Sequence, residues 1–219
     1  MTFNSLFVDR MVPQLLKPDY NEVFRYMGYS LKDRTELTDE VRPIVYEVVP
    51  QIQNILTPQA VYVSYPLKIE NDVLHFGNYE VKSKELARFE RNCSAIYLFA
   101  ATLGPKIDQA IQKQQKLDPV RGVIMQAAGA MYIEKYCDIL CQKISAEVKD
   151  AGCKTKNRFS PGFADVPLET QKLFFKVLDC SHKIGLTLMD TLIMAPEKSV
   201  TAFVGVESIK STEGIEKGE

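Results

Sequence analysis

The sequence has no excess of charge of either sign. Its 27 Lys and Arg residues are balanced by 28 Asp and Glu residues, which gives a formal net charge of −1. Domains that bind nucleic acid present a basic surface to the phosphates, and no strongly basic run supplies one here. The composition therefore argues against a nucleic-acid partner.

Long apolar runs are also missing. No segment approaches the roughly 18 apolar residues that a membrane span requires. The N-terminus, Met1 to Arg10, has neither the basic start nor the apolar stretch of a secretion signal. The five cysteines, an odd number without paired spacing, are typical of reduced thiols. We expect no membrane partner and a cytoplasmic location.

The common catalytic and metal-binding motifs are absent from the sequence. It contains no Gly-x-Gly-x-x-Gly, no phosphate loop and no Ser-His-Asp arrangement. Cys137 and Cys141 are four residues apart on one predicted helix face, but no second pair accompanies them. We interpret both as small core residues, and His75, in a strand pattern, as structural. The sequence offers no obvious acid–base machinery.

What the sequence does contain is a fixed cation next to a tight turn, in the segment from Arg158 to Gln171, RFSPGFADVPLETQ. The planar guanidinium of Arg158 can bind a carboxylate through two hydrogen bonds. Pro161 presets a turn, and Gly162 can adopt the positive φ that a type II turn requires, which presents Phe163 at a defined angle. The segment predicts a carboxylate-binding site beside an aromatic face.

The residues around this turn predict its surroundings. Asp150 to Asn157 are interpreted as a polar loop. Pro167 suits the first turn of a helix, predicted from Leu168 to Leu178, whose free N–H groups favour negative charge. Asp165 is predicted to cap this following helix rather than to contact a ligand.

Residue spacing along the rest of the chain predicts a mixture of helices and strands. Helices are expected over 19–27, 38–56, 83–92, 105–111 and 122–148, and strands over 60–65, 67–69, 73–76 and 94–101. Pro50 should kink or divide the second helix, and Asn71-Asp72 suits a hairpin turn.

The C-terminal part predicts a short helix and a closing hairpin. Thr187 and Asp190 have capping-box spacing. Leu192 to Met194 and Ser199 to Val206 are expected to pair around Pro196-Glu197-Lys198.

Together these patterns predict a single α+β domain over residues 1–206. We expect a twisted, mainly antiparallel sheet with helices packed against it. The Lys-, Glu- and Gly-rich stretch 207–219 is predicted to be a disordered tail.

Two segments carry a resemblance to a known family. The hexapeptide that starts at Arg158, RFSPGF, followed by Pro167, resembles the Arg-x-x-Pro-Gly-Tyr motif of the activation (reactivation) domain of cobalamin-dependent methionine synthase. The run from Met194 to Val200, MAPEKSV, resembles the closing segment of the same family. A weaker likeness extends from about 21 to 206. The sequence departs from the family at Phe163, where tyrosine is usual.

The resemblance implies a site for S-adenosylmethionine. In the family, the arginine holds the carboxylate of this ligand, and a glutamate on the preceding helix, after a small-residue patch, holds its amino group. Arg158 and Glu134 match these two positions, and Ala127 to Ala130 match the patch, which would let a backbone or a flat ligand approach closely. Without the resemblance, Glu134 would be interpreted as a solvated surface residue.

The resemblance implies that the rest of the ligand contacts the turn itself. Backbone groups near Ser160, together with Gly162, are the implied donors and acceptors. Phe163 would lie against the sulfonium or the corrin face, or would pack into the core as a turn aromatic. Asp179-x-x-His182 is one residue longer than the Asp-x-His spacing of cobalamin-carrying domains, so we interpret it as chance and His182 as a helix-terminal or surface residue.

The implied function is that of a stand-alone reactivation module. It would bind S-adenosylmethionine and support the reductive remethylation of cobalamin on a separate cobalamin-binding methionine synthase subunit, with a flavodoxin-like reductant. The homocysteine, folate and cobalamin modules of the full enzyme find no counterpart in these 219 residues. Two alternatives remain open: a corrinoid-protein docking factor without S-adenosylmethionine binding, which the Phe163 departure favours, and a reactivator of another corrinoid methyltransferase.

Overall fold

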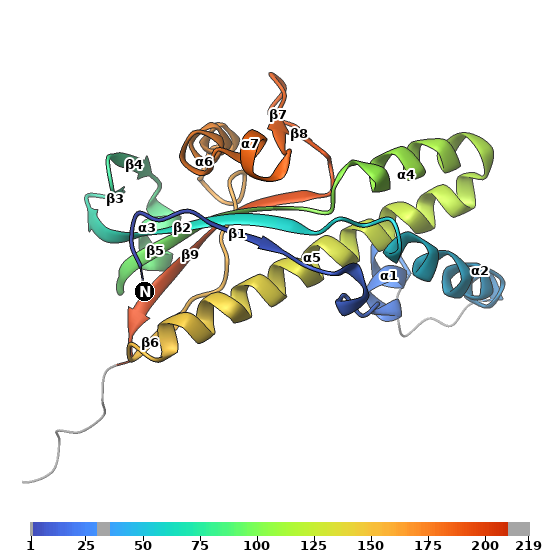
Figure 1. The fold of residues 1–219 in the computed structure, drawn as a ribbon, viewed down its shortest axis with the longest axis horizontal. Coiled ribbons are helices and arrows are strands. Elements are labelled where there is room, and N and C mark those ends of the chain that lie inside the picture. Colours follow the sequence, from blue (N-terminus) through green and yellow to red (C-terminus); the bar gives the residue numbers. More distant parts are fainter. Residues whose placement is uncertain (1, 30–35, 210–219) are drawn as a thin grey trace, which may run out of the picture.

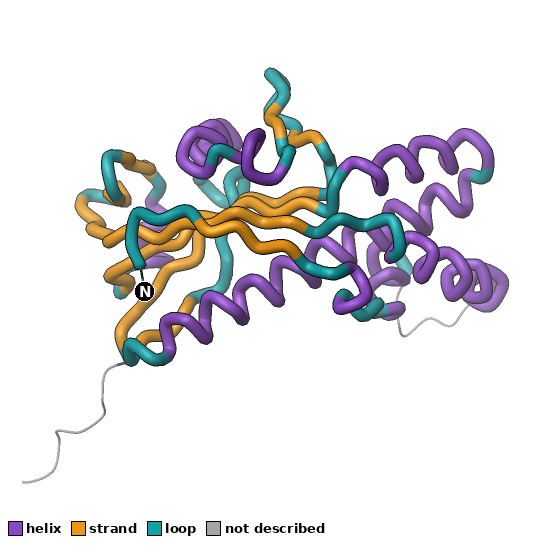
Figure 2. The backbone as a smooth tube through the Cα atoms, in the orientation of Figure 1, coloured by secondary structure: helices purple, strands orange, loops and turns teal. Residues whose placement is uncertain are grey.

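The computed structural model describes residues 2–29 and 36–209 and has the predicted α+β composition (Figures 1 and 2). Its helices are α1 (Tyr20–Tyr26), α2 (Glu36–Gln53), α3 (Lys84–Glu90), α4 (Pro105–Leu117), α5 (Pro119–Lys149), α6 (Gln171–Leu178) and α7 (Cys180–Ile184), with 3₁₀ turns η1 (Pro13–Leu15) and η2 (Leu168–Thr170). Its strands are β1 (Phe7–Arg10), β2 (Gln59–Glu70), β3 (Val73–Phe76), β4 (Tyr79–Lys82), β5 (Cys93–Thr102), β6 (Cys153–Thr155), β7 (Thr187–Leu188), β8 (Met194–Ala195) and β9 (Ser199–Ser208).

Seven strands form one sheet in the order β4-β3-β2-β5-β9-β6, with β1 paired to β2 outside this path. Each pairing in this sheet is antiparallel, as predicted. Asn71 and Asp72 both have positive φ and form the predicted turn between β2 and β3. In this order β2, β5 and β9 lie side by side in the centre of the sheet (Figure 1).

The central strand β5 is buried on both faces. Ala95, Tyr97 and Phe99 belong to one hydrophobic core, which they share with α2 and α5. The residues between and beside them enter a second core with α6 and α7; these are Ile96, Leu98 and Ala100. Because alternate side chains of a strand point to opposite faces, the sheet separates two helical layers (Figure 1).

The longest predicted helix is confirmed as α5, which begins at Pro119 with Asp118 as its N-cap and accounts for much of the first core. Its small-residue patch does not face an open groove. A Cβ atom added to Gly129 would lie 2.9 Å from Cε of Lys198, whose stem covers this part of the helix. Lys198 is almost fully buried, and this burial lowers the pKa of its ammonium group. At Gly129 the patch is therefore covered by the aliphatic part of the Lys198 side chain, and not by the backbone or flat ligand that the sequence resemblance suggested.

Pro50 does not divide the second predicted helix. Helix α2 contains both Pro43 and Pro50 and remains a single element. Pro50 lies close to its C-terminal end, where Val49 and Ile52 are buried, so packing on one face outweighs a lost backbone hydrogen bond. The two strands predicted on either side of Pro66 are one strand, β2.

The predicted polar loop 150–157 contains a strand. Residues of β6 pair with the end of β9, Thr155 with Val206 and Cys153 with Ser208. Three residues are too few for the alternating pattern that identifies a strand in a sequence. Strand β9 continues past the predicted domain end at 206, and residues 210–219 of the predicted tail lie outside the described residues.

The predicted closing hairpin and the helix near Thr187 were also wrong. β7 begins at Thr187 and pairs with β8 in a separate two-stranded sheet. Strand β9 pairs instead with β5 along its length and with β6 near its end. The family-like segment between β8 and β9 contains a cis Ala195–Pro196 bond, and Ser199 Oγ donates a hydrogen bond of 2.7 Å to the Pro196 carbonyl. Long buried strands pair with each other, which a local hairpin pattern does not predict.

None of the described helices is both long enough and apolar enough to span a membrane.

Candidate functional site

The segment after β6 continues along the edge of β9 and sets the direction of Arg158. Lys156 N–H donates to the Gly205 carbonyl, and Phe159 exchanges hydrogen bonds of 2.9 and 2.8 Å with Phe203. Because neighbouring side chains of an extended segment point to opposite sides, Phe159 enters the second core while Arg158 points to α5. The Arg158 side chain is 23% exposed.

The guanidinium of Arg158 bridges two carboxylates on α5. Its Nη1 donates to Asp138 Oδ1 at 2.8 Å, and its Nη2 donates to Glu134 Oε2. Glu134 and Asp138 are one helical turn apart and therefore lie on the same face of α5. The structure thus brings Arg158 and Glu134 into direct contact. Sequence reasoning missed Asp138, although its position four residues after Glu134 was a usable signal.

The ion pairs leave part of the guanidinium free for a ligand. Arginine carries five N–H donors, and these two hydrogen bonds occupy two of them. Burial opposes the charged form, but the carboxylates of Glu134 and Asp138 outweigh it and raise the pKa of Arg158. Arg158 therefore stays charged, with N–H groups available for a further carboxylate.

Two cysteines lie on α5 close to this arginine. Cys137 is fully buried, and Cys141 is partly buried at the edge of a groove. Burial raises the pKa of both thiols, and for Cys141 it outweighs the opposing effect of Arg158. Cys137 is a core residue, as predicted. In the part of the chain that the structure describes, no three His, Cys, Asp or Glu residues are grouped so that they could hold a metal ion.

The predicted turn after Arg158 is confirmed. Phe163 N–H donates to the Ser160 carbonyl at 3.2 Å, and Gly162 has φ +84°. The Ser160 carbonyl is therefore already used once and keeps one acceptor position. Phe163 is 65% exposed, so the alternative that it packs into the core was wrong. Its ring contacts the Phe159 ring edge-on at 5.2 Å between centroids.

Asp165 has a different role from the one predicted. Its carboxylate accepts hydrogen bonds from Ser83 Oγ and from the backbone N–H groups of Lys84 and Glu85. It therefore caps α3, which lies about 80 residues earlier in the chain. Pro167, predicted inside the first helical turn, immediately precedes the 3₁₀ turn η2. Asp165 thus ties the turn after Arg158 to α3.

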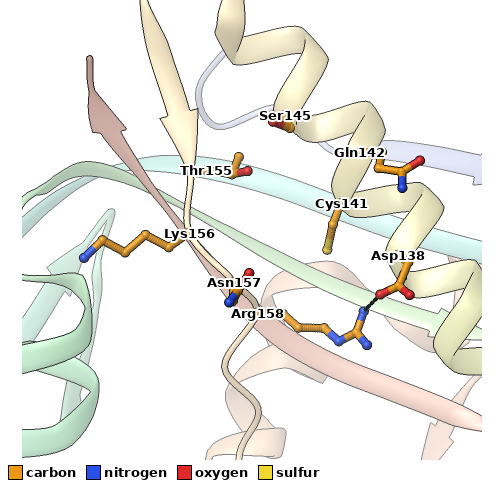
Figure 3. Close-up of a pocket in the computed structure, with 8 residues that line it drawn as sticks. All are labelled: Asp138, Cys141, Gln142, Ser145, Thr155, Lys156, Asn157 and Arg158. Atoms are coloured by element: carbon orange, nitrogen blue, oxygen red, sulfur yellow. Dashed lines mark hydrogen bonds and ion pairs between the residues drawn. The ribbon is translucent and has the colours of Figure 1, made fainter. Parts of the chain in front are cut away.

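Two grooves meet at Arg158. The polar groove, of about 440 Å³, lies between α5 and β6 and is lined by Asp138, Cys141, Gln142, Ser145, Thr155, Lys156, Asn157 and Arg158 (Figure 3). The aromatic groove, of about 480 Å³, lies between α3 and the turn and is lined by Glu85, Arg88, Phe89, Asn157, Arg158, Phe159, Ser160, Phe163 and Ala164. Asn157 and Arg158 belong to both grooves, so a ligand with a charged end and a flat ring system could span them.

Glu134 opens to a different cavity. A smaller cavity of about 140 Å³ lies between α1 and α5, and Glu134 lines it together with Asp19, Glu22 and Asp138. Glu134 lines neither the polar nor the aromatic groove. Of the predicted site residues, Arg158, Ser160 and Phe163 therefore share the aromatic groove, and Glu134 reaches it only through Arg158.

The two histidines have no part in these grooves. His182 lies in the short helix α7, is highly exposed and pairs with Asp179 at 2.6 Å, which confirms it as a helix-terminal surface residue. His75 lies in β3 and faces Glu80 across the β3–β4 hairpin.

Comparison with solved structures places the fold among methionine synthase reactivation domains. The chain matches a structure described as "Crystal Structure of the MetH Reactivation Domain bound to AdoHcy" with a TM-score of 0.73, over 96% of this chain and 80% of that chain, at 14% sequence identity. No protein-family model matches the chain, and no curated protein matches it. At this identity the likeness concerns the fold, and it confirms the predicted resemblance at that level.

Proposed function

We propose that this protein is an S-adenosylmethionine-binding reactivation module. It would support the reductive remethylation of cobalamin on a separate cobalamin-dependent methionine synthase, together with a flavodoxin-like reductant. The observation that carries the proposal is the position of Arg158, a charged guanidinium with unused N–H groups at the junction of two grooves. A fold neighbour that binds AdoHcy supports the same class of ligand.

The residues present fit such a ligand. Its carboxylate can bind the remaining N–H groups of Arg158, and its adenosyl part can lie in the aromatic groove near Phe89 and Phe163. The partner's cobalamin would accept the methyl group directly, without a proton transfer. For such a transfer the protein contributes binding and orientation rather than a general acid or base. A cytoplasmic location remains a prediction from the sequence.

Calorimetric titration with S-adenosylmethionine tests the proposal. We expect the wild-type protein to bind and Arg158→Ala to bind roughly ten- to a hundredfold more weakly, because charge-assisted hydrogen bonds are lost. Arg121→Ala is a matched control, since Arg121 also bridges two carboxylates but lines neither groove. Equal affinities for all three proteins, or no binding by the wild type, would contradict the proposal.

One observation favours the docking factor without S-adenosylmethionine binding. Arg158 already has two carboxylate partners, Glu134 and Asp138, so its charge is compensated without any ligand. A docking factor would show no heat with S-adenosylmethionine and would still bind a corrinoid protein in a pull-down. Pull-down with several purified corrinoid proteins also separates methionine synthase from another corrinoid methyltransferase as the partner.

A further inference from the structure

The geometry points to Asp138, rather than Glu134, as the residue that binds the ammonium group of the ligand. This inference rests on the proposed function and assigns one of its contacts. It reverses the assignment implied by the sequence resemblance, in which Glu134 has this role.

The first step concerns which acid faces the ligand. Asp138 and Arg158 line the same polar groove, whereas Glu134 lines only the cavity between α1 and α5. Figure 3 shows the Asp138 carboxylate and the Arg158 guanidinium directed at each other at the edge of this groove. An amino acid end bound at Arg158 from the polar groove therefore meets Asp138, whereas Glu134 lines neither groove.

The second step concerns free hydrogen-bonding capacity. Asp138 accepts from Arg158 with Oδ1, at 2.8 Å, and its other oxygen has no hydrogen bond to a described residue. An ionised carboxylate accepts several hydrogen bonds, so Asp138 can hold an ammonium without releasing Arg158. The α-carboxylate and α-ammonium of an amino acid are adjacent, as are the guanidinium of Arg158 and the free oxygen of Asp138. The two pairs of charges are complementary.

The third step gives Glu134 another role. Glu134 lines neither groove and accepts a hydrogen bond from Arg158 Nη2. Glu134 and Asp138 together fix the plane of the guanidinium, because each holds a different terminal nitrogen. Glu134 is therefore a positioning residue, whose loss should weaken every ligand that binds Arg158 by a similar factor.

The test compares S-adenosylhomocysteine with its analogue that lacks the α-amino group. For the wild type and for Glu134→Gln, we expect the analogue to bind about tenfold or more weakly, because a charge-assisted hydrogen bond is missing. For Asp138→Asn, the two ligands should bind within about twofold of each other. Both substituted side chains are about half exposed, and thermal unfolding of each variant checks that the fold is kept.

The opposite pattern would overturn the assignment. If Glu134→Gln abolished the preference for the amino group and Asp138→Asn kept it, Glu134 would be the ammonium ligand and the proposed function would stand. If the wild type bound neither compound, the proposed function would fail, and the assignment with it. The two failures are therefore distinguishable in one series of titrations.

Discussion

Arg158 and Arg121 form two similar ion clusters with different surroundings. Each arginine bridges two carboxylates, Glu134 and Asp138 for Arg158, and Glu47 and Asp118 for Arg121. Their side chains are 23% and 28% exposed. Yet Arg158 lies between two grooves, and Arg121 lines neither of them. An arginine with two acidic partners is therefore not evidence of a ligand site by itself.

The backbone around the two arginines explains the difference. Arg121 lies in the first turn of α5, where its neighbours continue a regular helix. Arg158 lies between a short strand and a turn with Gly162 at positive φ, so the chain leaves the sheet edge and opens space on both sides. Irregular backbone at the end of a strand, held by tertiary contacts, creates the grooves that a helix surface lacks.

Replacing Gly162 tests whether the shape of the turn matters, and it has the largest expected effect on stability. In Gly162→Ala, the alanine would have to adopt the φ of +84° that Gly162 has. Its Cβ would lie 3.2 Å from Leu168 Cδ1. We expect a loss of about 1–2 kcal/mol in the free energy of unfolding, from positive φ alone. We also expect weaker S-adenosylmethionine binding, because Phe163 is displaced. Urea unfolding and calorimetry measure the two effects.

Gly152→Ala is the matched control for this variant. Gly152 also has positive φ, +68°, but nothing lies within 4 Å of an added Cβ. Its unfolding free energy should fall by a similar amount while ligand affinity is unchanged. A parallel loss of affinity in both variants would show that general destabilisation, and not the turn, controls binding.

Glu90, a buried acid beside the Arg158 segment, should make the stability of the protein depend on pH. Burial raises the pKa of Glu90, although Cys93 and Lys156 oppose the shift, whereas Glu47 and Asp118 near Arg121 are about half exposed. Above the unfolded pKa of about 4.5, the unfolded state loses a proton that folded Glu90 keeps. Its contribution to stability therefore falls as pH rises toward the folded pKa.

Glu90→Gln should remove this dependence. We expect the difference in unfolding free energy between Glu90→Gln and the wild type to increase in favour of glutamine as pH rises from 4.5. The slope can reach about 1.4 kcal/mol per pH unit for a single proton. Urea unfolding at several pH values measures it, and a constant difference across the range would contradict a raised pKa.

Removal of two helix caps, one next to each arginine cluster, should have the smallest effect on the free energy of unfolding. Asp165 caps α3 from the turn after Arg158, and Asp118 caps α5 next to Arg121. Replacement of either by alanine should cost about 1 kcal/mol of stability. Only Asp165→Ala should lower the affinity for S-adenosylmethionine, by a few-fold, because α3, which forms one wall of the aromatic groove, would no longer be hydrogen-bonded to the turn. Equal affinities in the two variants would exclude a role for Asp165 in shaping that groove.

The sequence predicted the local features of the site and missed the non-local ones. The turn after Arg158, helix α5 and the strands β3 and β5 follow from spacing and turn chemistry within short windows. The capping of α3 by Asp165 and the pairing of β6 with β9 join residues distant in the chain. No local pattern encodes such contacts, because they depend on which segments the completed sheet brings together.

The same limit applies to the acidic residues of the site. The family resemblance implied Glu134, which follows a small-residue patch, but Gly129 in that patch is covered by Lys198. Asp138 has the same chemistry one turn later, and only the position of β6 shows that it borders the polar groove. A helix pattern identifies a face, and the neighbouring strand decides which residue on that face can meet a ligand.

The stem of Lys198 over Gly129 also bears on how this protein can diverge. A larger residue at 129 would have to expel the stem, and a shorter residue at 198 would leave a void above α5. Neither position can drift freely while the other stays fixed. Orthologues that lack the glycine should therefore carry a shorter side chain at the position of the lysine, a paired exchange that would be visible in an alignment of related genomes.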